Sequence, residues 1–389
     1  MATGLSRVIQ AMPPSEIRKI FTAAGSMSDV MHLEIGDPDF PTPPHIVDAA
    51  HRAARDGFTH YTATAGTIET REAIAAKLCR DNGISCDPSS EVIVTVGAVG
   101  AIMSACMAVL NPGDEAIVTE PNWPNYLAQI MMAGAKPVLL PLRESLGFAP
   151  DLDELRARIT PRTRMIIVNS PNNPCGSVLS RETLIGIGEI ALRNNLVVVC
   201  DEVYEKILYD GNTHFSLASL PEYRDNVLTV NALSKTYAMT GWRVGYAAGP
   251  ATIISAMAKV LEASASCVSS VVQKAAVAAL TGPQDVVSRM VEIYRRRRNM
   301  ILEGLKEIPG IRTIAPGGAF YVFPNIACFG LKSFDFAMAL LREARVAVVH
   351  GAGLGESGEG HVRIAFSAAD DVIAEALRRI ASWAENRRR

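Results

Sequence analysis

Short runs of valine and isoleucine alternate with longer segments of helical pattern through the middle of this chain. The runs are EVIVTVG (91–97), DEAIVTE (114–120), RMIIVNSP (164–171), LVVVCDE (196–202) and NVLTVNALSK (226–235). Near-continuous apolar strands separated by helices are typical of a parallel sheet that is covered on both faces. This alternation predicts an α/β fold with a large domain built on a mostly parallel sheet flanked by helices.

The pattern changes at LTGPQD (280–285). One long helical segment, DVVSRMVEIYRRRRNMILEGLKEI, follows, and after it come three short strand-like runs, GAFYVFP, VAVVHG and GHVRIAFS. We therefore expect a large domain over residues 45–284 and a smaller α+β domain over 285–389, joined by the N-terminal segment 1–44. The arginine runs YRRRRN (294–299) and NRRR at the end of the chain are expected to lie on hydrated surface, as clusters of one charge usually do.

Composition excludes several classes of protein. Only 20% of the 389 residues are charged and the formal net charge is −2, which argues against a nucleic-acid or polybasic membrane surface. The seven cysteines form neither a CxxC pair nor a cysteine–histidine pattern at zinc spacing, so we expect reduced thiols and no metal.

The first residues, MATGLSRVIQAMPPSEIRK, lack the apolar stretch of a signal peptide, and no apolar run approaches the ~18 residues of a membrane helix. We expect a soluble, cytoplasmic protein.

Charged residues follow two of the predicted strands. Asp201 ends the run LVVVC, and Lys235 follows VLTVN, with Arg243 further along in an apolar neighbourhood. Ligands of open α/β sheets bind beyond the carboxyl ends of the strands. Taken singly, Asp201 reads as a turn or helix cap and Lys235 as a surface residue. Taken together they indicate a ligand site, because a buried acid requires a cationic partner and a buried lysine is a competent amine nucleophile.

Lys235, Arg243 and Asp201 match the groups of one cofactor. The amine suits an aldehyde, the rigid guanidinium suits a phosphate, and the acid suits a protonated ring nitrogen. Pyridoxal 5'-phosphate (PLP) carries all three groups. A dinucleotide site is the weaker interpretation, since VTVGAVGAI contains G-x-x-G without the full G-x-G-x-x-G.

Seven segments carry a resemblance to a known family. SKTYAMTGWRVGYAAGP (234–250) resembles the PLP-lysine segment of the class I aminotransferases, which have the fold type I architecture. IGDPDFPTP (35–43) and HYTATAGTIETREAIA (60–75) resemble the family's N-terminal blocks, and NWPNY, NSPNNPCG, DEVYEKI and GHVRIAFS follow in the family's order and spacing. The likeness covers nearly the whole chain and is strongest to the aspartate-aminotransferase-like branch of bacteria and archaea.

The resemblance implies roles for five residues around the cofactor ring. Lys235 forms a Schiff base with PLP and moves the proton between the substrate's α-carbon and the cofactor. Asp201 keeps the ring nitrogen protonated, and Asn173 and Tyr204 contact the oxygen at the ring's 3-position. Trp123 stacks on the ring face, although a single tryptophan or tyrosine would ordinarily be explained by core packing.

The resemblance also implies a phosphate site, made by the backbone amides and side chains of Gly97, Ala98, Val99, Ser234 and Arg243. The three amides open a helix, so the helix dipole also favours the anion.

Further residues are implied for substrate and partner. Arg363 clamps the substrate's α-carboxylate, Gly36 offers a backbone contact, and Trp123 and Asn173 also border the substrate. Tyr61 reaches the phosphate of the neighbouring subunit, which implies a homodimer with shared active sites.

The activity that the resemblance implies is a PLP-dependent aminotransferase, which moves an amino group from an L-amino acid to a 2-oxo acid by ping-pong chemistry. A lyase, cyclase or decarboxylase on the same fold is the alternative, because PLP stabilises the same carbanion in each. An effector sensor of a transcription factor is not expected, since the family's first block begins within the first ~15 residues and leaves no room for a DNA-binding domain.

Three positions depart from the family's pattern. Ala232 stands where many relatives carry a phosphate-binding hydroxyl, and Cys175 replaces the commoner threonine of NPTG. Val99 stands where some aspartate-specific relatives have a lysine for the substrate's distal carboxylate. We expect the phosphate site to persist, and the sequence leaves the amino donor open among acidic, neutral and aromatic amino acids.

Overall fold

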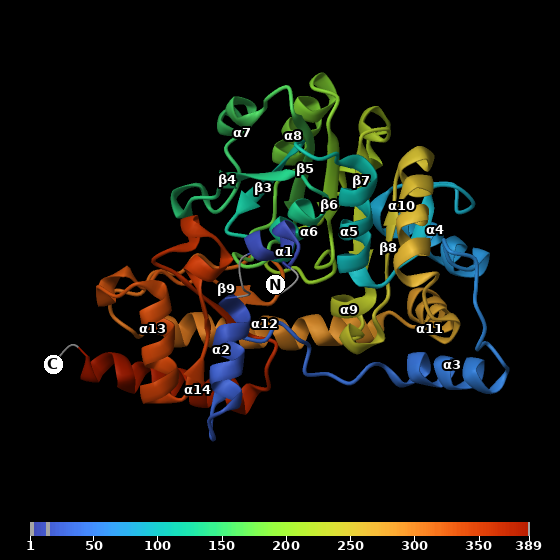
Figure 1. Cartoon of the computed structure of the whole chain (residues 1–389). Helices are drawn as coiled ribbons and strands as arrows, with labels where there is room; N and C mark the ends of the chain where they lie inside the picture. The colour runs from blue at the N-terminus through green and yellow to red at the C-terminus, as the bar shows by residue number, and fades with distance from the viewer. Residues whose placement is uncertain (1–3, 13–15, 388–389) are drawn as a thin grey trace.

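The computed structural model describes residues 4–12 and 16–387 (Figure 1). Its centre is a seven-stranded sheet in the order β2-β8-β7-β6-β5-β3-β4. Neighbouring strands from β4 to β7 pair in parallel, and β8 pairs antiparallel with both β2 and β7. The predicted α/β fold with a mostly parallel sheet is confirmed. The strands are β2 (Val92–Thr95), β3 (Glu115–Glu120), β4 (Lys136–Pro141), β5 (Thr163–Asn169), β6 (Val197–Asp201), β7 (Val227–Ala232) and β8 (Gly245–Ala248).

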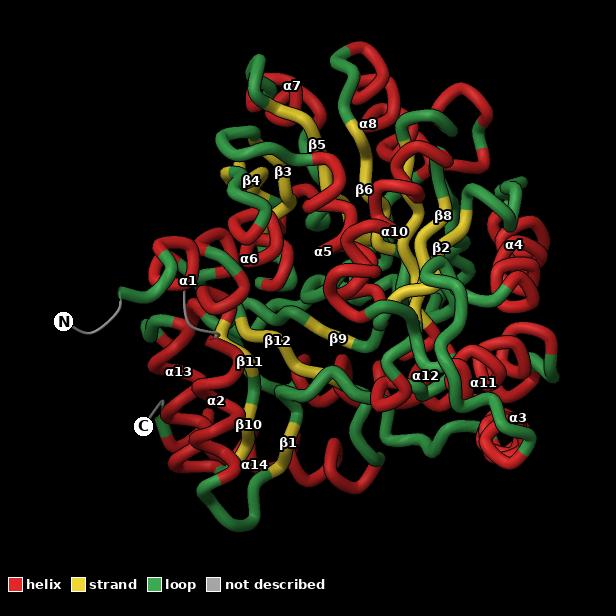
Figure 2. Tube along the Cα trace, turned by 45° about the vertical axis from the view of Figure 1, so that its right-hand side comes forward, coloured by secondary structure: helices red, strands yellow, loops and turns green. Residues whose placement is uncertain are grey.

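Helices cover both faces of this sheet (Figures 1 and 2). Ile93 of β2 packs in one core with residues of the helices α5, α6 and α10, whereas the next residue, Val94, packs in the other core with residues of α4, α8 and α11. Successive strand residues therefore face opposite helical layers, which explains the continuous apolar runs. These helices are α4 (Ile68–Asn82), α5 (Gly97–Val109), α6 (Asn125–Met132), α8 (Arg181–Arg193), α10 (Ala251–Ala265) and α11 (Ser270–Thr281), with α3 (Pro44–Arg55) and α7 (Leu152–Arg158) further out.

Two strands of the sheet have no clear signal in the sequence. β4 (KPVLLP) contains two prolines and lies at the sheet edge, where most of its side chains stay partly exposed. β8 (GYAA) consists mostly of small residues, and its first residue, Gly245, passes close to the start of α5. A Cβ atom on Gly245 would lie 2.7 Å from the backbone nitrogen of Ala98, so only glycine fits there.

The register of the sheet brings charged residues to one edge. Asn169, the last residue of β5, pairs with Asp201, the last residue of β6, and Asp201 pairs with Val230 in β7. After β7 the chain enters the short helix α9 (Leu233–Thr236), which carries Lys235. Parallel strands end on the same side of a sheet, so Asp201 and Lys235 lie where ligands of open sheets bind.

The C-terminal part of the chain forms a second, smaller group of strands (Figure 2). Three of them form an antiparallel sheet of order β11-β12-β9, and β10 pairs in parallel with β1 from the N-terminal segment. In the described residues no helix is both long enough and apolar enough to cross a bilayer. The elements are β1 (Met31–His32), β9 (Tyr321–Val322), β10 (Val346–Ala347), β11 (Val349–His350) and β12 (Val362–Ala365), with α1 (Arg7–Ala11), α2 (Glu16–Gly25), α12 (Asp285–Lys306), α13 (Ser333–Ala339) and α14 (Asp370–Asn386).

The arginine run of α12 does not lie wholly on hydrated surface, so that expectation is wrong for half of the run. Arg297 and Arg298 keep only 5% and 4% of their surface exposed, whereas Arg296 is exposed. These two arginines face acids on distant segments, Asp39 and Asp210. Each buried cation therefore has a carboxylate partner, which a run of one charge in the sequence does not reveal. The last two residues of the terminal run NRRR lie outside the described residues.

Candidate active site

A cavity of about 770 Å³ opens at the carboxyl edge of the large sheet. Its walls come from the ends of the central strands, the start of α5, the helix α2 and the strands β9 and β12. Of the predicted site residues, Gly97 directly precedes the lining part of α5 and Tyr61 lies elsewhere. The others line the cavity: Gly36, Ala98, Val99, Trp123, Asn173, Asp201, Tyr204, Ser234, Lys235, Arg243 and Arg363.

Asp201 presents a buried carboxylate to this cavity. It accepts a hydrogen bond from the Tyr126 hydroxyl at 2.6 Å and one from the backbone N–H of Val203 at 3.3 Å. Burial raises the pKa of Asp201 to about 6, although both hydrogen bonds oppose the rise. A cationic ligand group beside Asp201 would offset the cost of keeping this carboxylate ionised.

Lys235 reaches the cavity from α9, the short helix that directly follows β7. Its Nζ donates a hydrogen bond to the carbonyl of Gly36 at 2.6 Å and lies 5.6 Å from the centre of the Phe320 ring. Burial, assisted by the nearby guanidinium groups of Arg363 and Arg243, lowers the pKa of Lys235 to about 8. The neutral amine, which a nucleophile for carbonyl groups requires, is therefore far more populated near neutral pH than in an ordinary lysine.

The start of α5 forms a cradle for an anion together with Arg243. Gly97 has a φ of +69°, and a Cβ atom there would lie 2.7 Å from Nη2 of Arg243, so glycine lets the guanidinium approach the helix N-terminus. The lining residues Ala98, Val99 and Ser234 complete this end of the cavity. Free backbone N–H groups, the helix dipole and a guanidinium together suit a phosphate.

Arg363 projects from β12 at another wall of the cavity. Its Nη1 donates to Oδ1 of Asn173 at 3.0 Å and its Nη2 donates to the carbonyl of Glu34 at 2.7 Å. Its Nε has no hydrogen-bond partner within the described part of the chain, although only 3% of the residue is exposed. The guanidinium lies 4.6 Å from the Tyr321 ring, which supports its face. A buried guanidinium with a free N–H favours a carboxylate ligand.

The sequence reasoning missed two residues that hold Asp201 and its neighbours. Tyr126, the last residue of the quoted motif NWPNY, donates to the Asp201 carboxylate. Asn169, the first residue of NSPNNPCG, donates through Nδ2 to the Asp201 carbonyl at 2.9 Å, and its Oδ1 accepts from the backbone N–H of Asn173 at 2.8 Å. Both are polar residues at the ends of motifs that the sequence analysis had identified, and this position was the signal that could have marked them as site residues.

Tyr321 is a third residue that the sequence reasoning missed, although its segment GAFYVFP was recognised as a strand. Its hydroxyl lies 3.0 Å from the hydroxyl of Tyr204. A Cβ atom on Gly36 would overlap the Tyr321 hydroxyl, so Gly36 is small because this tyrosine packs against it. The side chain of Tyr321 therefore contacts three predicted site residues: Gly36, Tyr204 and Arg363.

Trp123 and Tyr61 differ in their relation to the cavity. Trp123 lines it and packs edge-on against Tyr126, with ring centroids 5.4 Å apart. Tyr61 is outside the cavity, and 88% of its surface is exposed. Tyr61 therefore contributes no wall to the cavity of its own chain.

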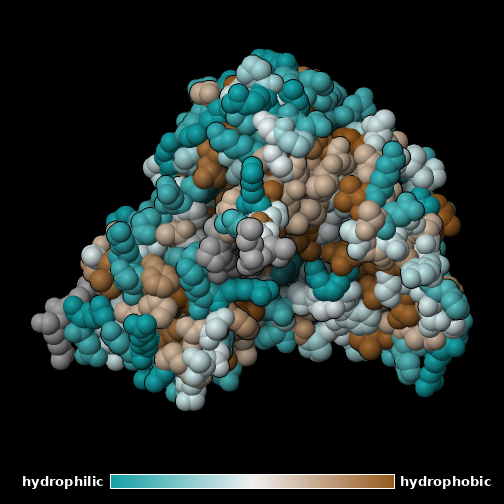
Figure 3. All heavy atoms as spheres, viewed as in Figure 1, coloured by the Kyte–Doolittle hydropathy of each residue, from teal (hydrophilic) through white to brown (hydrophobic). Residues whose placement is uncertain are grey.

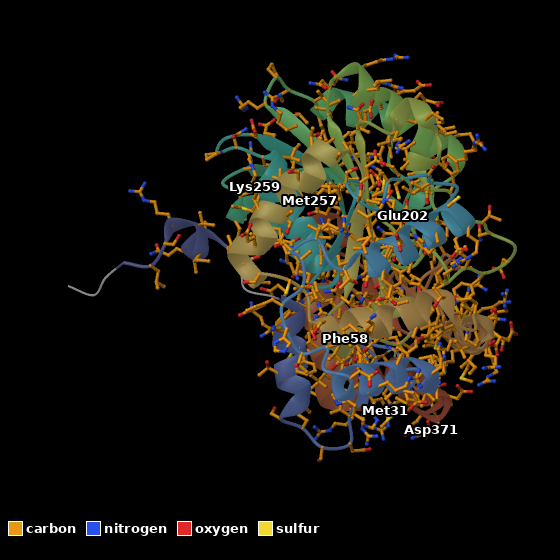
Figure 4. All side chains as sticks on the ribbon, turned by 90° about the vertical axis from the view of Figure 1, so that its right-hand side faces the viewer. Met31, Phe58, Glu202, Met257, Lys259 and Asp371 are labelled. Carbon is orange, nitrogen blue, oxygen red and sulfur yellow. The ribbon has the colours of Figure 1, made fainter. Side chains whose placement is uncertain are left out.

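Titratable side chains also gather around Glu202, which follows Asp201 in the chain and is labelled in Figure 4. Ligand atoms of Glu202, Glu205 and His214 lie within 4.8 Å of one another. Lys77 already donates to Glu205, and Nε2 of His214 lies 2.9 Å from Glu202. Burial opposes protonation of His214, but the carboxylates of Glu202 and Glu205 together outweigh burial and raise the pKa of His214. Lys77 and a protonated His214 would balance the two carboxylates beside the end of β6.

The donor set of the cavity fits PLP. Lys235 supplies an amine whose lowered pKa suits an aldehyde, and the buried Asp201 suits a cationic ring nitrogen. The start of α5 with Arg243 suits the phosphate, and Arg363 remains available for a carboxylate of the substrate.

Comparison with known proteins agrees with this chemistry. Residues 28–380 match the family described as aminotransferase class I and II. The aspartate aminotransferase of Pyrococcus abyssi is 42% identical over 97% of each chain, and the aromatic-amino-acid aminotransferase 2 of Thermococcus litoralis is 39% identical over the same share. The structure of the aspartate aminotransferase of Thermus thermophilus with maleate matches with a TM-score of 0.93 at 40% identity, over 98% of this chain and 99% of that one. This chain therefore belongs to the class I and II aminotransferases and is a PLP-dependent enzyme that transfers amino groups.

Proposed function

We propose that the amino group passes from an L-amino acid to a 2-oxo acid in the 770 Å³ cavity, with Lys235 and Asp201 as the reacting side chains and Tyr204 beside them. The observation that carries the proposal is that one cavity holds an amine of lowered pKa, a buried acid and the buried guanidinium of Arg363. A lyase, cyclase or decarboxylase is not favoured, because the relatives compared above are named as aminotransferases.

When bound, PLP supplies an aldehyde that accepts amines and a ring that draws electron density from the substrate's α-carbon. Nζ of Lys235 would take the proton from that α-carbon and, as a general acid, would deliver it to the carbon that carried the cofactor's aldehyde, a role that its lowered pKa suits. The Asp201 carboxylate, held by Tyr126, keeps a proton on the ring nitrogen. Tyr204 and Asn173 donate to the oxygen at the ring's 3-position.

The remaining residues bind and orient. Arg243, Ser234 and the amides of Gly97, Ala98 and Val99 hold the phosphate. Arg363 orients the substrate's α-carboxylate, with the backbone of Gly36 and the side chain of Asn173 beside it. Trp123 covers one face of the ring and excludes water.

Amino transfer has products that distinguish it from the other reactions of PLP enzymes. We expect each turnover to convert one amino acid and one 2-oxoglutarate into one 2-oxo acid and one glutamate, without release of ammonia or CO2. The relatives' names make aspartate and the aromatic amino acids the first donors to test, beside alanine as a neutral donor. Both products are followed by chromatography. Stoichiometric ammonia or CO2 would contradict the proposal and favour a lyase or a decarboxylase.

We also propose a homodimer in which each active site receives the partner subunit's Tyr61. Apolar side chains are exposed over α5 and α10 (Figure 3), where a groove of about 660 Å³ is lined by residues such as Met103, Met107 and Leu261. Helix α1 has no buried residue and projects from the body in Figure 4. Together with the exposed Tyr61, these surfaces support a second copy as the partner.

Mixed dimers test the shared site. Tyr61→Phe removes one hydroxyl, so it should weaken retention of PLP by ~0.5–3 kcal/mol and leave the dimer intact. At limiting PLP, a mixture of Tyr61→Ala and Lys235→Ala should recover activity, because the heterodimer places both lesions in one site. A mixture of Lys235→Ala and Asp201→Asn is the control: each site keeps one lesion and no recovery is expected. A fully active monomer by light scattering, or no recovery in the first mixture, contradicts the proposal.

Two further proposals concern organisation and location. We propose that residues 45–284 and 285–389 are domains that share the cavity, with segment 1–44 belonging to the smaller one, because β1 pairs with β10. We propose a cytoplasmic location, which the unpaired state of all seven cysteines, each within the described residues, supports.

A further inference from the structure

Arg297 on α12 holds segments of the chain that are far apart in sequence. Its Nη1 and Nη2 donate to the two carboxylate oxygens of Asp39, each at 2.7 Å, and its Nε donates to Asp370 at 2.7 Å. Nη1 also donates to the carbonyl of Ser367 at 3.3 Å. Only 6% of the Arg297 side chain is exposed, and this planar fork fixes all three partners in one geometry.

The segments that Arg297 joins carry groups of the active site. Asp39 lies shortly after Gly36, whose carbonyl accepts the hydrogen bond from Lys235. Ser367 lies shortly after Arg363 at the end of β12. Arg297 thus connects the segment of Gly36 with that of Arg363 from outside the cavity.

A second contact turns this connection into a closed ring. The hydroxyl of Ser367 donates to the carbonyl of Ile35 at 3.3 Å, and Ile35 directly precedes Gly36. The ring runs from Arg297 through Asp39, Gly36 and Ile35 to Ser367 and back to Arg297. Gly36 therefore has a fixed neighbour on each side.

Aromatic packing extends from Arg297 to the reactive lysine. The guanidinium lies 5.3 Å from the Phe40 ring, whose centroid is 5.4 Å from that of Tyr294. Tyr294 in turn contacts Phe320 at 5.4 Å, and the Phe320 ring faces Nζ of Lys235. These rings connect Arg297 with Lys235 by packing alone, and a substitution at Arg297 leaves each of the rings in place.

We propose that Arg297 is a positioning residue for the substrate: its bidentate hydrogen bonds to Asp39 hold the Gly36 backbone at the right distance from Arg363 to receive an α-carboxylate. The inference rests on the proposed role of Arg363. Arg297 is not among the residues that line the cavity, so it acts through Asp39 and Ser367.

The test replaces the fork and keeps the charge. Arg297→Lys can reach Asp39 with one ammonium group only. We expect it to raise KM for both substrates by about 10-fold or more and to change kcat by less than about 3-fold, because small displacements of a binding group cost up to ~10²-fold. Binding of maleate, an unreactive carboxylate, to the PLP-loaded enzyme should weaken by a similar factor in calorimetry, with unchanged retention of PLP.

Two variants serve as references. Arg289→Lys lies on the same helix with 67% of its side chain exposed and pairs with Asp285, so its KM and maleate affinity should equal those of the wild type. Arg363→Lys should raise KM at least as much as Arg297→Lys. An unchanged KM in Arg363→Lys contradicts the proposed function, whereas a raised KM there with an unchanged KM in Arg297→Lys overturns the positioning role alone.

A merely structural role makes a different prediction. It would lower the melting temperature of Arg297→Lys without changing KM or the affinity for maleate, and that result overturns the proposal. If Arg297→Lys does not fold, Asp39→Asn replaces it, since it removes the charge of the partner and keeps its size. Asp39→Asn should raise KM as well. Where Arg297→Lys does fold, the double variant Arg297→Lys with Asp39→Asn should raise KM by less than the product of the two single effects, because both substitutions break the same contact.

Discussion

Replacement of Lys235 by alanine is expected to abolish amino transfer while PLP still binds through Arg243, Ser234 and the start of α5. The variant loses both the amine that reacts with the aldehyde and the group that moves the α-proton. General acid–base catalysis alone contributes about 10²- to 10⁴-fold, so the rate should fall by at least ~10³-fold. Single-turnover measurements on the PLP-loaded variant check this.

The matched control is Lys306→Ala, a change of the same kind at an exposed position near the end of α12. It should retain the wild-type rate. Lys235→Ala should also keep the fold, because Asp201, the buried acid whose charge Lys235 helps to offset, retains its hydrogen bonds from the Tyr126 hydroxyl and the Val203 backbone N–H. Transamination by Lys235→Ala at the wild-type rate would show that another amine reacts.

Asp201→Asn is expected to give the second largest loss. The amide has nearly the same shape as the carboxylate, but it cannot hold a positive charge on the ring nitrogen. Removing one partner of a buried charge pair costs ~3–5 kcal/mol, which corresponds to a loss of about 10²- to 10⁴-fold in rate. The folded state should persist, because Tyr126 can still donate to the amide oxygen at this position.

Steady-state rates and the melting temperature together separate a chemical from a structural effect of Asp201→Asn. Asp153→Asn, at a position where 92% of the side chain is exposed, is the control and should leave both unchanged. Near-normal turnover of Asp201→Asn would show that a different group faces the ring nitrogen.

The sheet could be predicted from the sequence because a strand that is buried on both faces has apolar residues at successive positions. The runs at 91–97 and 196–202 are apolar at successive positions, and the structure places alternate residues in two cores. β8 shows no such run, although Tyr246 and Ala247 also pack in the two cores, and its first residue, Gly245, is determined by the close approach of the α5 start. The residue type at a position such as Gly245 depends on a contact with a segment that is distant in the sequence.

The same distinction applies to the active site. Asp201 and Lys235 stand at strand ends, so the rule for open sheets placed them correctly. The burial of Arg297 depends on Asp39, which is 258 positions away in the sequence, and no periodicity within α12 indicates that pairing. Tyr321 is likewise defined by Gly36 and Tyr204, which come from other parts of the chain.

The most direct measurement of the central claim locates the lysine that carries the cofactor. The PLP-loaded enzyme is reduced with borohydride, digested, and its peptides are analysed by mass spectrometry. The account predicts the added mass of the cofactor on the peptide that contains Lys235. Labelling of a different lysine, such as the buried Lys77, or no labelled peptide at all, would contradict it.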